Sequence, residues 1–221
     1  MKGIFITGTD TGVGKTLIVA GIAKMLLEKG VRVGIIKPIS SGGIPSQDII
    51  YLQKCLSYKN IISPIQFKLP LAPYAAAKLE NKSINFKKIF KSLDNLSKNC
   101  DFVIAEGIGG AMVPILKNYF VTDLIKDFKL PVIILSRPGL GTLNHTFMTI
   151  EVLEKRKIKI LGVIINGFKK IGVPEKTNSD IIEEISGYPI LAKIKWDKQY
   201  PKNIKLLADV LKNSKILTAL I

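Results

Sequence analysis

Residues 8–16 read GTDTGVGKT and join a short apolar run to a long amphipathic one. Small residues and glycines let backbone N–H groups turn toward phosphate oxygens, while the lysine and threonine reach phosphate and magnesium. The common pattern G-x-x-x-x-G-K-[ST] has glycine where Thr9 stands, and Gly8 is one place early. The triplet Gly14-Lys15-Thr16 between strand and helix still predicts a site for a nucleoside triphosphate with magnesium; the alternative is an ordinary strand-to-helix turn.

Short apolar runs alternate with amphipathic segments along the rest of the chain, and the runs are rich in Ile and Val, as strands buried on both faces are. The predicted strands are Gly3–Thr7, Arg32–Lys37, Phe102–Ala105, Val132–Leu135, Leu161–Ile165 and Ile190–Ile194. The predicted helices are Lys15–Lys29, Gln47–Leu56, Phe86–Lys98, Thr122–Phe128, Leu143–Lys155, Asn178–Ser186 and Asn203–Leu211. This order predicts an α/β fold with a mainly parallel, doubly wound sheet of the P-loop NTPase type, in one domain spanning residues 1–221.

The composition is strongly basic, with 33 Lys and Arg against 17 Asp and Glu. Only three of the basic residues are arginines, and the lysines are scattered, whereas base readout and a bidentate phosphate grip favour arginine. We therefore expect no nucleic-acid partner and a lysine-rich surface that attracts small anions. No apolar run is long enough to cross a membrane, and the cysteines, Cys55 and Cys100, form no C-x-x-C pair, so we expect a cytoplasmic protein.

In a parallel sheet, ligands bind beyond the carboxyl ends of the strands. Lys37 ends the second predicted strand, so it lies at the same edge as Lys15, and two lysines beside one triphosphate suggest stabilisation of charge during phosphoryl transfer. Ser41 follows and offers a hydroxyl to a substrate, or only makes a turn. Asp48 begins the next helix and is either a magnesium ligand or a usual helix-start residue.

An acidic residue also ends the strand Phe102–Ala105, where Glu106 is followed by Gly107, Ile108, Gly109 and Gly110. An acid at the tip of a buried strand is the second metal-side element of P-loop proteins, so Glu106 is predicted to have a metal-binding or catalytic role, with a structural role as the alternative. The glycines let the chain pass close to substrate or phosphate.

Two later strands are also followed by polar turns. Residues 136–145 form a small-residue turn into a helix, whose free N–H groups suit a carboxylate; His145, the one histidine, is assigned to packing or capping. Asn166 follows the fifth predicted strand, and its amide has the donor and acceptor needed to read a base edge, although Asn-Gly is also a common turn pair.

Together these motifs resemble the dethiobiotin synthetase family. The resemblance is carried by GTDT-x-VGKT at 8–16, KP-x-x-SG at 37–42, Asp48, EG-x-GG at 106–110, LG-x-x-NH at 140–145 and Asn166. It implies ATP- and Mg-dependent carboxylation of 7,8-diaminopelargonate with CO2, followed by ring closure to dethiobiotin in biotin synthesis. Gly12 stands where the family frequently has an acidic residue, and Lys195 where it more often has proline before Trp196.

The resemblance also implies a role for each matching residue. Lys15 and Lys37 are catalytic, and Thr16, Asp48 and Glu106 hold magnesium. The residues implied to bind the nucleotide are Gly12, Val13, Gly14, Lys15, Thr16, Leu17, Asp48, Glu106, Gly107, Ile108, Gly109 and Asn166. The residues implied to bind the diamine are Ser41, Gly110, Gly141, Thr142, Leu143 and Asn144. In the family the substrate carboxylate meets a helix N-terminus of a second subunit, which implies a homodimer.

The main alternative is a regulatory P-loop ATPase of the partition or cell-division kind. Those proteins carry an additional lysine early in the loop, at the position that Asp10 occupies here, and often end in an amphipathic membrane helix. The tail, residues 203–221, has apolar residues with lysines between them. We expect it to form a final helix that covers the core, with membrane contact as the alternative. A cobyrinate diamide synthase would need a separate glutaminase partner.

Overall fold

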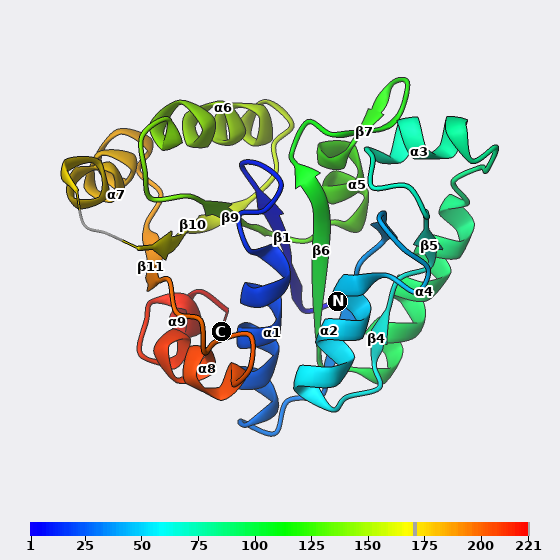
Figure 1. The fold of residues 1–221 in the computed structure, drawn as a ribbon, viewed down its shortest axis with the longest axis horizontal. Coiled ribbons are helices and arrows are strands. Elements are labelled where there is room, and N and C mark those ends of the chain that lie inside the picture. Colours follow the sequence, from blue (N-terminus) through cyan, green and yellow to red (C-terminus); the bar gives the residue numbers. More distant parts are fainter. Residues whose placement is uncertain (170–171, 221) are drawn as a thin grey trace.

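The computed structural model describes residues 1–169 and 172–220. Its centre is a sheet of seven strands in which all neighbouring strands are parallel (Figure 1). The order is β11 (Ile190–Lys195), β10 (Ile160–Phe168), β9 (Val132–Ser136), β1 (Gly3–Gly8), β6 (Phe102–Gly110), β2 (Val33–Ile36) and β4 (Ile61–Ile62). The predicted α/β fold with a mainly parallel sheet is therefore confirmed.

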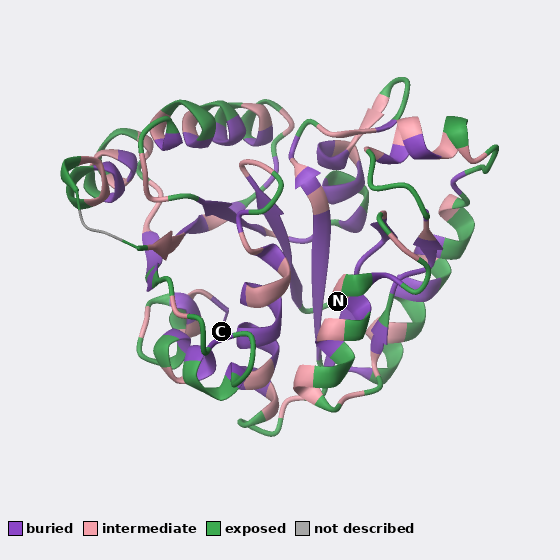
Figure 2. Ribbon diagram, in the orientation of Figure 1, coloured by how far each residue is buried: buried purple, intermediate pink, exposed green. Residues whose placement is uncertain are grey.

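Helices cover both faces of this sheet. One face carries α1 (Lys15–Leu27), α2 (Gln47–Leu56), α8 (Ile204–Lys212) and α9 (Ile216–Leu220). The other carries α3 (Pro73–Leu79), α4 (Phe86–Asn99), α5 (Val121–Phe128), α6 (Thr142–Lys155) and α7 (Val173–Ser186). Side chains of a strand alternate between the two cores: Ile4 and Ile6 of β1 join the first and Phe5 joins the second. Burial on both faces explains the continuous apolar runs, and Figure 2 shows the strands buried along most of their length.

Several predicted boundaries were wrong, and two of them concern the site. The strand β6 does not end at Ala105 but runs to Gly110, because the register shifts after the pair of Ile6 with Glu106, and extra residues of β6 are accommodated before Gly110 pairs with Gly8. Glu106 therefore lies within a strand and not at its tip. In the same way β10 continues to Phe168, so Asn166 belongs to the strand.

Other elements were missed because they are very short. The seventh strand, β4, has two residues, as do β3 (Ile39–Ser40) and its partner β5 (Ile65–Gln66). The hairpin of β7 (Pro114–Leu116) and β8 (Tyr119–Phe120) was also not predicted. The helix α7 begins at Val173 and not at Asn178; Pro174 in its first turn and Glu175, which accepts from the N–H of Gly172, are its start signals.

The C-terminal tail covers the core, as predicted, but as two helices and not one. Leu207 and Leu211 of α8 are fully buried against α1, so closely that a Cβ added to Gly21 would lie 2.7 Å from Leu211 Cδ1. Ile221 lies outside the described residues. Within the part of the chain that the structure describes, no helix combines the length and apolar character needed to span a bilayer.

Candidate active site

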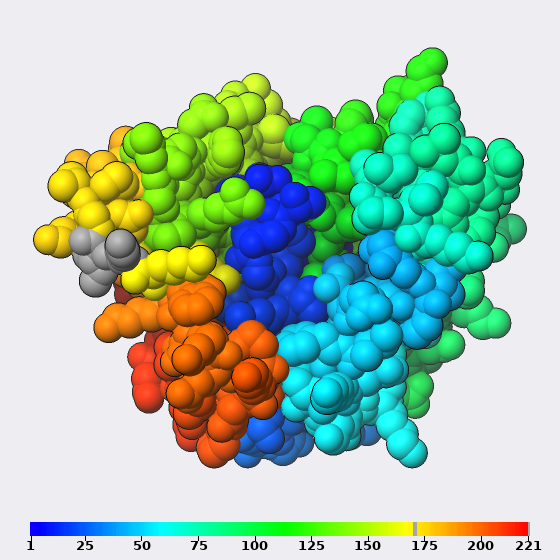
Figure 3. All heavy atoms as spheres, viewed as in Figure 1, coloured from blue at the N-terminus to red at the C-terminus, as the bar shows by residue number. Residues whose placement is uncertain are grey.

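The loop at residues 8–16 leaves β1 and enters α1 through two glycines in left-handed conformations, with φ of 69° at Gly12 and 92° at Gly14. A side chain at Gly14 would require Asn166 to move, because a Cβ there would lie 2.3 Å from its Nδ2. In the space-filling view the blue segment that contains the loop is visible at the centre of one face, between green, cyan and orange segments (Figure 3). The loop is therefore open to a ligand on this face.

Three carbonyl groups of the loop accept hydrogen bonds from side chains. These bonds run from Lys15 Nζ to Asp10 (3.0 Å), from Arg137 Nη2 to Thr11 (2.7 Å) and from Asn166 Nδ2 to Val13 (2.9 Å). The backbone N–H groups of Gly12, Val13 and Gly14 make no hydrogen bond within residues 1–169 and 172–220. The first N–H groups of α1 likewise have no partner inside the helix. Because side chains hold these carbonyl oxygens and the neighbouring N–H groups keep their hydrogens available, the loop forms a site for an anion.

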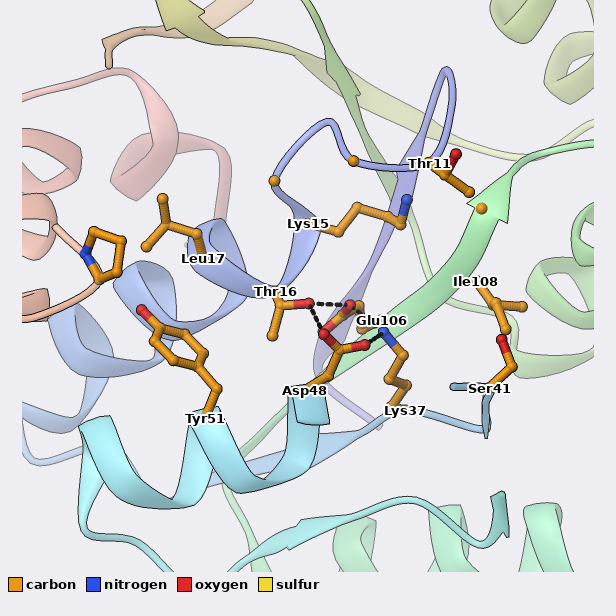
Figure 4. A pocket seen from close by; sticks show the side chains of 14 residues that line it. Thr11, Lys15, Thr16, Leu17, Lys37, Ser41, Asp48, Tyr51, Glu106 and Ile108 are labelled. Carbon is orange, nitrogen blue, oxygen red and sulfur yellow. Dashed lines mark hydrogen bonds and ion pairs between the residues drawn. The ribbon is translucent and has the colours of Figure 1, made fainter. Parts of the chain in front are cut away.

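Four side chains meet directly below the loop, three from α1, α2 and β6 and one, Lys37, from the residue after β2 (Figure 4). Thr16 Oγ1 lies 3.1 Å from Asp48 Oδ1 and 2.8 Å from Glu106 Oε1. The ammonium of Lys37 lies between the same two carboxylates, 2.6 Å from Glu106 Oε1 and in direct contact with Asp48 Oδ2. Glu106 is fully buried, so its charge depends on these partners.

The surroundings act differently on the two lysines. Burial alone lowers the pKa of Lys37, but the carboxylates of Glu106 and Asp48 outweigh it and hold that pKa above its ordinary value. Burial lowers the pKa of Lys15 to about 8, opposed by the charge of Glu106 and reinforced by that of Lys37. Lys37 is therefore a fixed cation, and Lys15 is a cation that lacks a close carboxylate partner.

Both lysines line one cavity of about 430 Å³, together with Thr16, Asp48 and Glu106. Ser41, Ile108 and Gly109 line the same cavity, as Figure 4 shows for the first two. This is the size of an ordinary small-molecule site. Its walls bring together positive charge, two carboxylates and the free loop N–H groups, which suits a phosphorylated ligand with a divalent cation.

The residues fit magnesium in type and number. Mg²⁺ is usually bound through one or two carboxylates and completed by substrate phosphates and water. Thr16, Asp48 and Glu106 supply a hydroxyl and two carboxylates, and the second oxygen of Glu106, Oε2, is buried without a hydrogen-bond partner. Among the described residues no group of three or more His, Cys, Asp or Glu could bind a metal, so phosphate ligands would have to complete this site.

A second cavity of about 770 Å³ lies on the other side of the loop. Gly12, Gly14 and Leu17 line both cavities, whereas Val13 lines only the second. Asn166 and Trp196 also line the second cavity, and Lys195 is not among its residues. Asn166 was predicted either to read a base or to make a turn. It sits in a strand, and its amide nitrogen is engaged by the loop carbonyl of Val13.

Some predicted site residues lie outside both cavities. Gly107 is buried against Phe5, and Gly110 lines a third cavity beside His145. The group 141–144 forms the start of α6, which begins at Thr142 with Gly141 before it, one residue earlier than predicted. It does not line either of the two cavities around the loop. Within one chain, the start of α6 is therefore separate from the loop site.

Comparisons with known proteins agree with this geometry. A family model described as an AAA domain matches residues 2–203. The chain is 43% identical over 198 residues to the ATP-dependent dethiobiotin synthetase BioD of Bacillus licheniformis, covering 86% of this chain and 84% of that protein. It is 42% identical over 210 residues to the protein of the same name from Aquifex aeolicus, covering 93% and 96%.

The chain belongs to the dethiobiotin synthetase family. The resemblance seen in its motifs is thereby confirmed, and so are the use of ATP and the assignment to the ligases. Solved structures give the fold alone. The MinC:MinD cell division complex of Aquifex aeolicus has a TM-score of 0.62 at 17% identity, covering 96% of this chain and 93% of that chain. A putative plasmid partition protein of Borrelia burgdorferi bound to AMPPNP has a TM-score of 0.63 at 16% identity, covering 99% and 97%. The cell-division and partition proteins therefore share the fold but are distant in sequence, at 17% and 16% identity, whereas the two dethiobiotin synthetases are 43% and 42% identical to this chain.

The sequence analysis missed several residues that line the two cavities. Tyr51, Pro201 and Thr11 line the first, and Arg137 lines the second. Tyr51 lies one helical turn after Asp48, a spacing that places it on the same side of α2. Arg137 carried a weaker sign, since it directly follows the strand β9 at the ligand-binding edge of the sheet.

Proposed function

We propose that this chain is an ATP- and magnesium-dependent dethiobiotin synthetase that converts 7,8-diaminopelargonate and CO2 to dethiobiotin. The observation that carries the proposal is that two buried lysines, Lys15 and Lys37, line one cavity beside a loop with free N–H groups. A carbamate and a triphosphate are both anionic, and this cavity supplies fixed positive charge to both. The membership of the family supplies the identity of the substrates.

The reaction has three steps that the cavity can support. One amine of the diamine adds to CO2 and loses a proton, giving a carbamate. The carbamate oxygen then attacks the γ-phosphorus of ATP, and ADP leaves. The second amine attacks the carbonyl carbon of the carbamoyl phosphate, and the ring closes with release of phosphate and a proton. Lys37 and Lys15 stabilise the negative charge on the carbamate and on the transferring phosphoryl group.

Thr16, Asp48 and Glu106 would hold the magnesium ion, which supplies charge neutralisation to the phosphates when bound. Lys37 now lies between the two carboxylates. With magnesium held by these residues, the ammonium of Lys37 would face the cavity that it lines and meet the carbamate and the γ-phosphate. Gly12–Leu17, Ile108 and Gly109 would surround the phosphates, whereas Gly107 lies outside the cavities. Asn166 would approach the base with its free carbonyl oxygen.

Ser41 and Gly110 would contact the diamine near its amines, and the start of α6 would bind its carboxylate. The start of α6 is a helix N-terminus, which attracts an anion, although the N–H of Thr142 already donates to Gly139. Because this helix start lies outside the loop cavities of its own chain, we propose that it serves the site of a second copy in a homodimer. We also propose a cytoplasmic location, where ATP is supplied, with neither nucleic acid nor membrane as partner.

The direct test is formation of the product. The purified chain is incubated with ATP, Mg²⁺, the diamine and isotopically labelled bicarbonate, and dethiobiotin is detected by mass spectrometry. We expect label in the ureido carbon, and none when ATP, metal or diamine is omitted. Absence of labelled product in the complete mixture would reject the proposal. Equilibrium sedimentation tests the homodimer separately, since a monomer at assay concentration would reject the shared site.

A further inference from the structure

Arg137 links the loop after β9 to the tip of the phosphate loop. Its Nη2 donates to the carbonyl of Thr11 at 2.7 Å and lies 3.4 Å from Oδ2 of Asp10. The side chain is about half exposed, and it borders the 770 Å³ cavity on the side of the loop away from Lys37. The proposed reaction assigns no role to Arg137.

We propose that Arg137 is a positioning residue for ATP binding, which fixes the tip of the phosphate loop so that its N–H groups face the phosphates. A peptide unit presents its carbonyl and its N–H on opposite sides, so a carbonyl held outward turns the adjoining N–H inward. The carbonyl of Thr11 shares its peptide unit with the N–H of Gly12, which has no hydrogen-bond partner in the described residues. Arg137 thus orients the N–H of Gly12, which is the group that would donate to a phosphate.

The aspartate beside this contact reinforces the same geometry. The N–H of Thr11 donates to Oδ1 of Asp10 at 2.6 Å, so the carboxylate closes a local turn and leaves Oδ2 toward Arg137. The hydrogen bond from Thr11 lowers the pKa of Asp10, and the charge of Arg137 lowers it further. These contacts tie the loop tip from within the same chain.

The backbone that follows Arg137 is held by a buried residue of α7. Asn178 Nδ2 donates to the carbonyl of Pro138 at 2.9 Å and lies 3.2 Å from that of Gly139. Asn178 is almost fully buried, so the backbone next to Arg137 has a fixed anchor. An exposed ion pair alone contributes little, because water screens it. Here the backbone next to Arg137 is anchored, and its guanidinium donates to a carbonyl of the phosphate loop. This contact reduces the motion of the loop in the free protein, so ATP binding has less motion to stop.

The chain offers matched controls for a test. Its other arginines are Arg32 and Arg156, and Arg156 also makes one ion pair with an aspartate, Asp123, at 3.4 Å. Arg156 lines neither cavity around the loop. The single tryptophan, Trp196, lines the cavity that Arg137 borders, so its fluorescence reports nucleotide binding without turnover.

The experiment compares Arg137→Ala, Arg137→Met and Arg156→Ala with the unchanged chain, using titration with ATP and Mg²⁺ followed by Trp196 fluorescence. We expect both Arg137 variants to raise the Kd for ATP about tenfold, the loss typical of one hydrogen bond to a charged group, and Arg156→Ala to leave it unchanged. The KM for the diamine should stay the same while the KM for ATP rises. A merely structural role would instead lower the melting temperature and weaken both substrates together.

An unchanged Kd for ATP in either folded Arg137 variant would overturn the inference, and so would an equal loss in Arg156→Ala. Should the alanine variant not fold, the methionine variant decides, because it keeps the length of the side chain and removes its donors. The inference rests on the proposed use of ATP and not on the diamine. A chain that binds ATP but forms no dethiobiotin would therefore refute the proposed reaction while leaving Arg137 testable.

Discussion

The ammonium of Lys37 lies 2.6 Å from Oε1 of Glu106, and both side chains are buried. This contact joins the charge that would act on the substrate to the carboxylate that would hold the metal. In the structure the lysine occupies the place between two carboxylates that a divalent cation would contest. Lys37 is thus a counter-ion of both carboxylates in this structure, and in the proposed reaction it would also act on the substrate.

Lys37→Ala should reduce turnover by at least about 10²-fold, since one preorganised electrostatic donor is worth roughly 10²–10³ in rate. It should also lower the melting temperature without Mg²⁺, because removing one partner of a buried ion pair costs about 3–5 kcal/mol. Mg²⁺ should restore part of that stability by binding the freed carboxylates. Phosphate release and thermal melts with and without Mg²⁺ measure both effects.

Lys155→Ala is the matched control, because Lys155 makes an exposed pair with Glu151. It should change neither rate nor stability. Full turnover by Lys37→Ala would reject the catalytic role, and an unchanged melting temperature in metal-free buffer would show that the pair with Glu106 does not stabilise the fold.

The affinity for ATP should fall as pH rises above about 8. The pKa of Lys15 in the free protein is lowered from 10.5 to about 8, so its ammonium begins to lose its proton there. Bound phosphates favour the charged form and raise this pKa, so binding takes up a proton above pH 8 and weakens by up to about tenfold per pH unit. Calorimetry in buffers of different ionisation enthalpy measures the proton uptake.

The contribution of Lys15 to the free energy of unfolding should change with pH in the opposite direction to the affinity for ATP. Between pH 8 and 10.5 the unfolded chain keeps the proton that folded Lys15 has lost, so the contribution of Lys15 to stability rises with pH. Lys15→Gln should remove the proton uptake on ATP binding. Uptake that persists in that variant would assign it to another group.

Gly14→Ala should abolish ATP binding. It should also lower the free energy of unfolding by more than the cost of a positive φ, because the new Cβ would clash with Asn166. A Cβ at Gly14 meets Asn166 Nδ2 at 2.3 Å, and the residue has φ of 92°. Gly30 has φ of 78° with nothing within 4 Å of its added Cβ, so Gly30→Ala tests the strain without the clash. We expect about 1–2 kcal/mol for Gly30→Ala and a larger loss for Gly14→Ala in urea unfolding. Equal losses would show that Asn166 simply moves aside.

Leu207→Ala should destabilise the fold by about 2–5 kcal/mol, because Leu207 fills the core between α8 and α1. The neighbouring Leu206 is partly exposed, so Leu206→Ala should have a small effect. Urea unfolding measures both. This comparison also tests the alternative function of the tail. A stable Leu207 variant that no longer binds anionic vesicles would favour a membrane helix over a core helix.

The loop and the strands could be predicted from the sequence because their causes are local. Gly14, Lys15 and Thr16 are adjacent, and strands buried on both faces are apolar throughout. The two-residue strand Ile61–Ile62 had no such pattern, since its place depends on pairing with β2. The extension of β6 past Glu106 was missed for a similar reason, because it depends on the pairing of Gly110 with Gly8 of β1 beyond a register shift.

The predictability of the site residues followed the same rule. Lys37 ends a predicted strand, Glu106 follows another and Asp48 begins a predicted helix, all at one edge of the sheet, so their meeting could be expected. Arg137 contacts a carbonyl 126 positions earlier in the chain, and no local pattern indicates that contact. Asn166 was recognised as polar and well placed, but only the structure shows its amide turned toward Val13.

The most direct test of the account is phosphate release by the purified chain in the presence of ATP, Mg²⁺ and bicarbonate, with and without 7,8-diaminopelargonate. The account predicts release that requires the diamine, that matches the dethiobiotin formed, and that stops when the metal is chelated. Release at the background rate with the diamine present would contradict it.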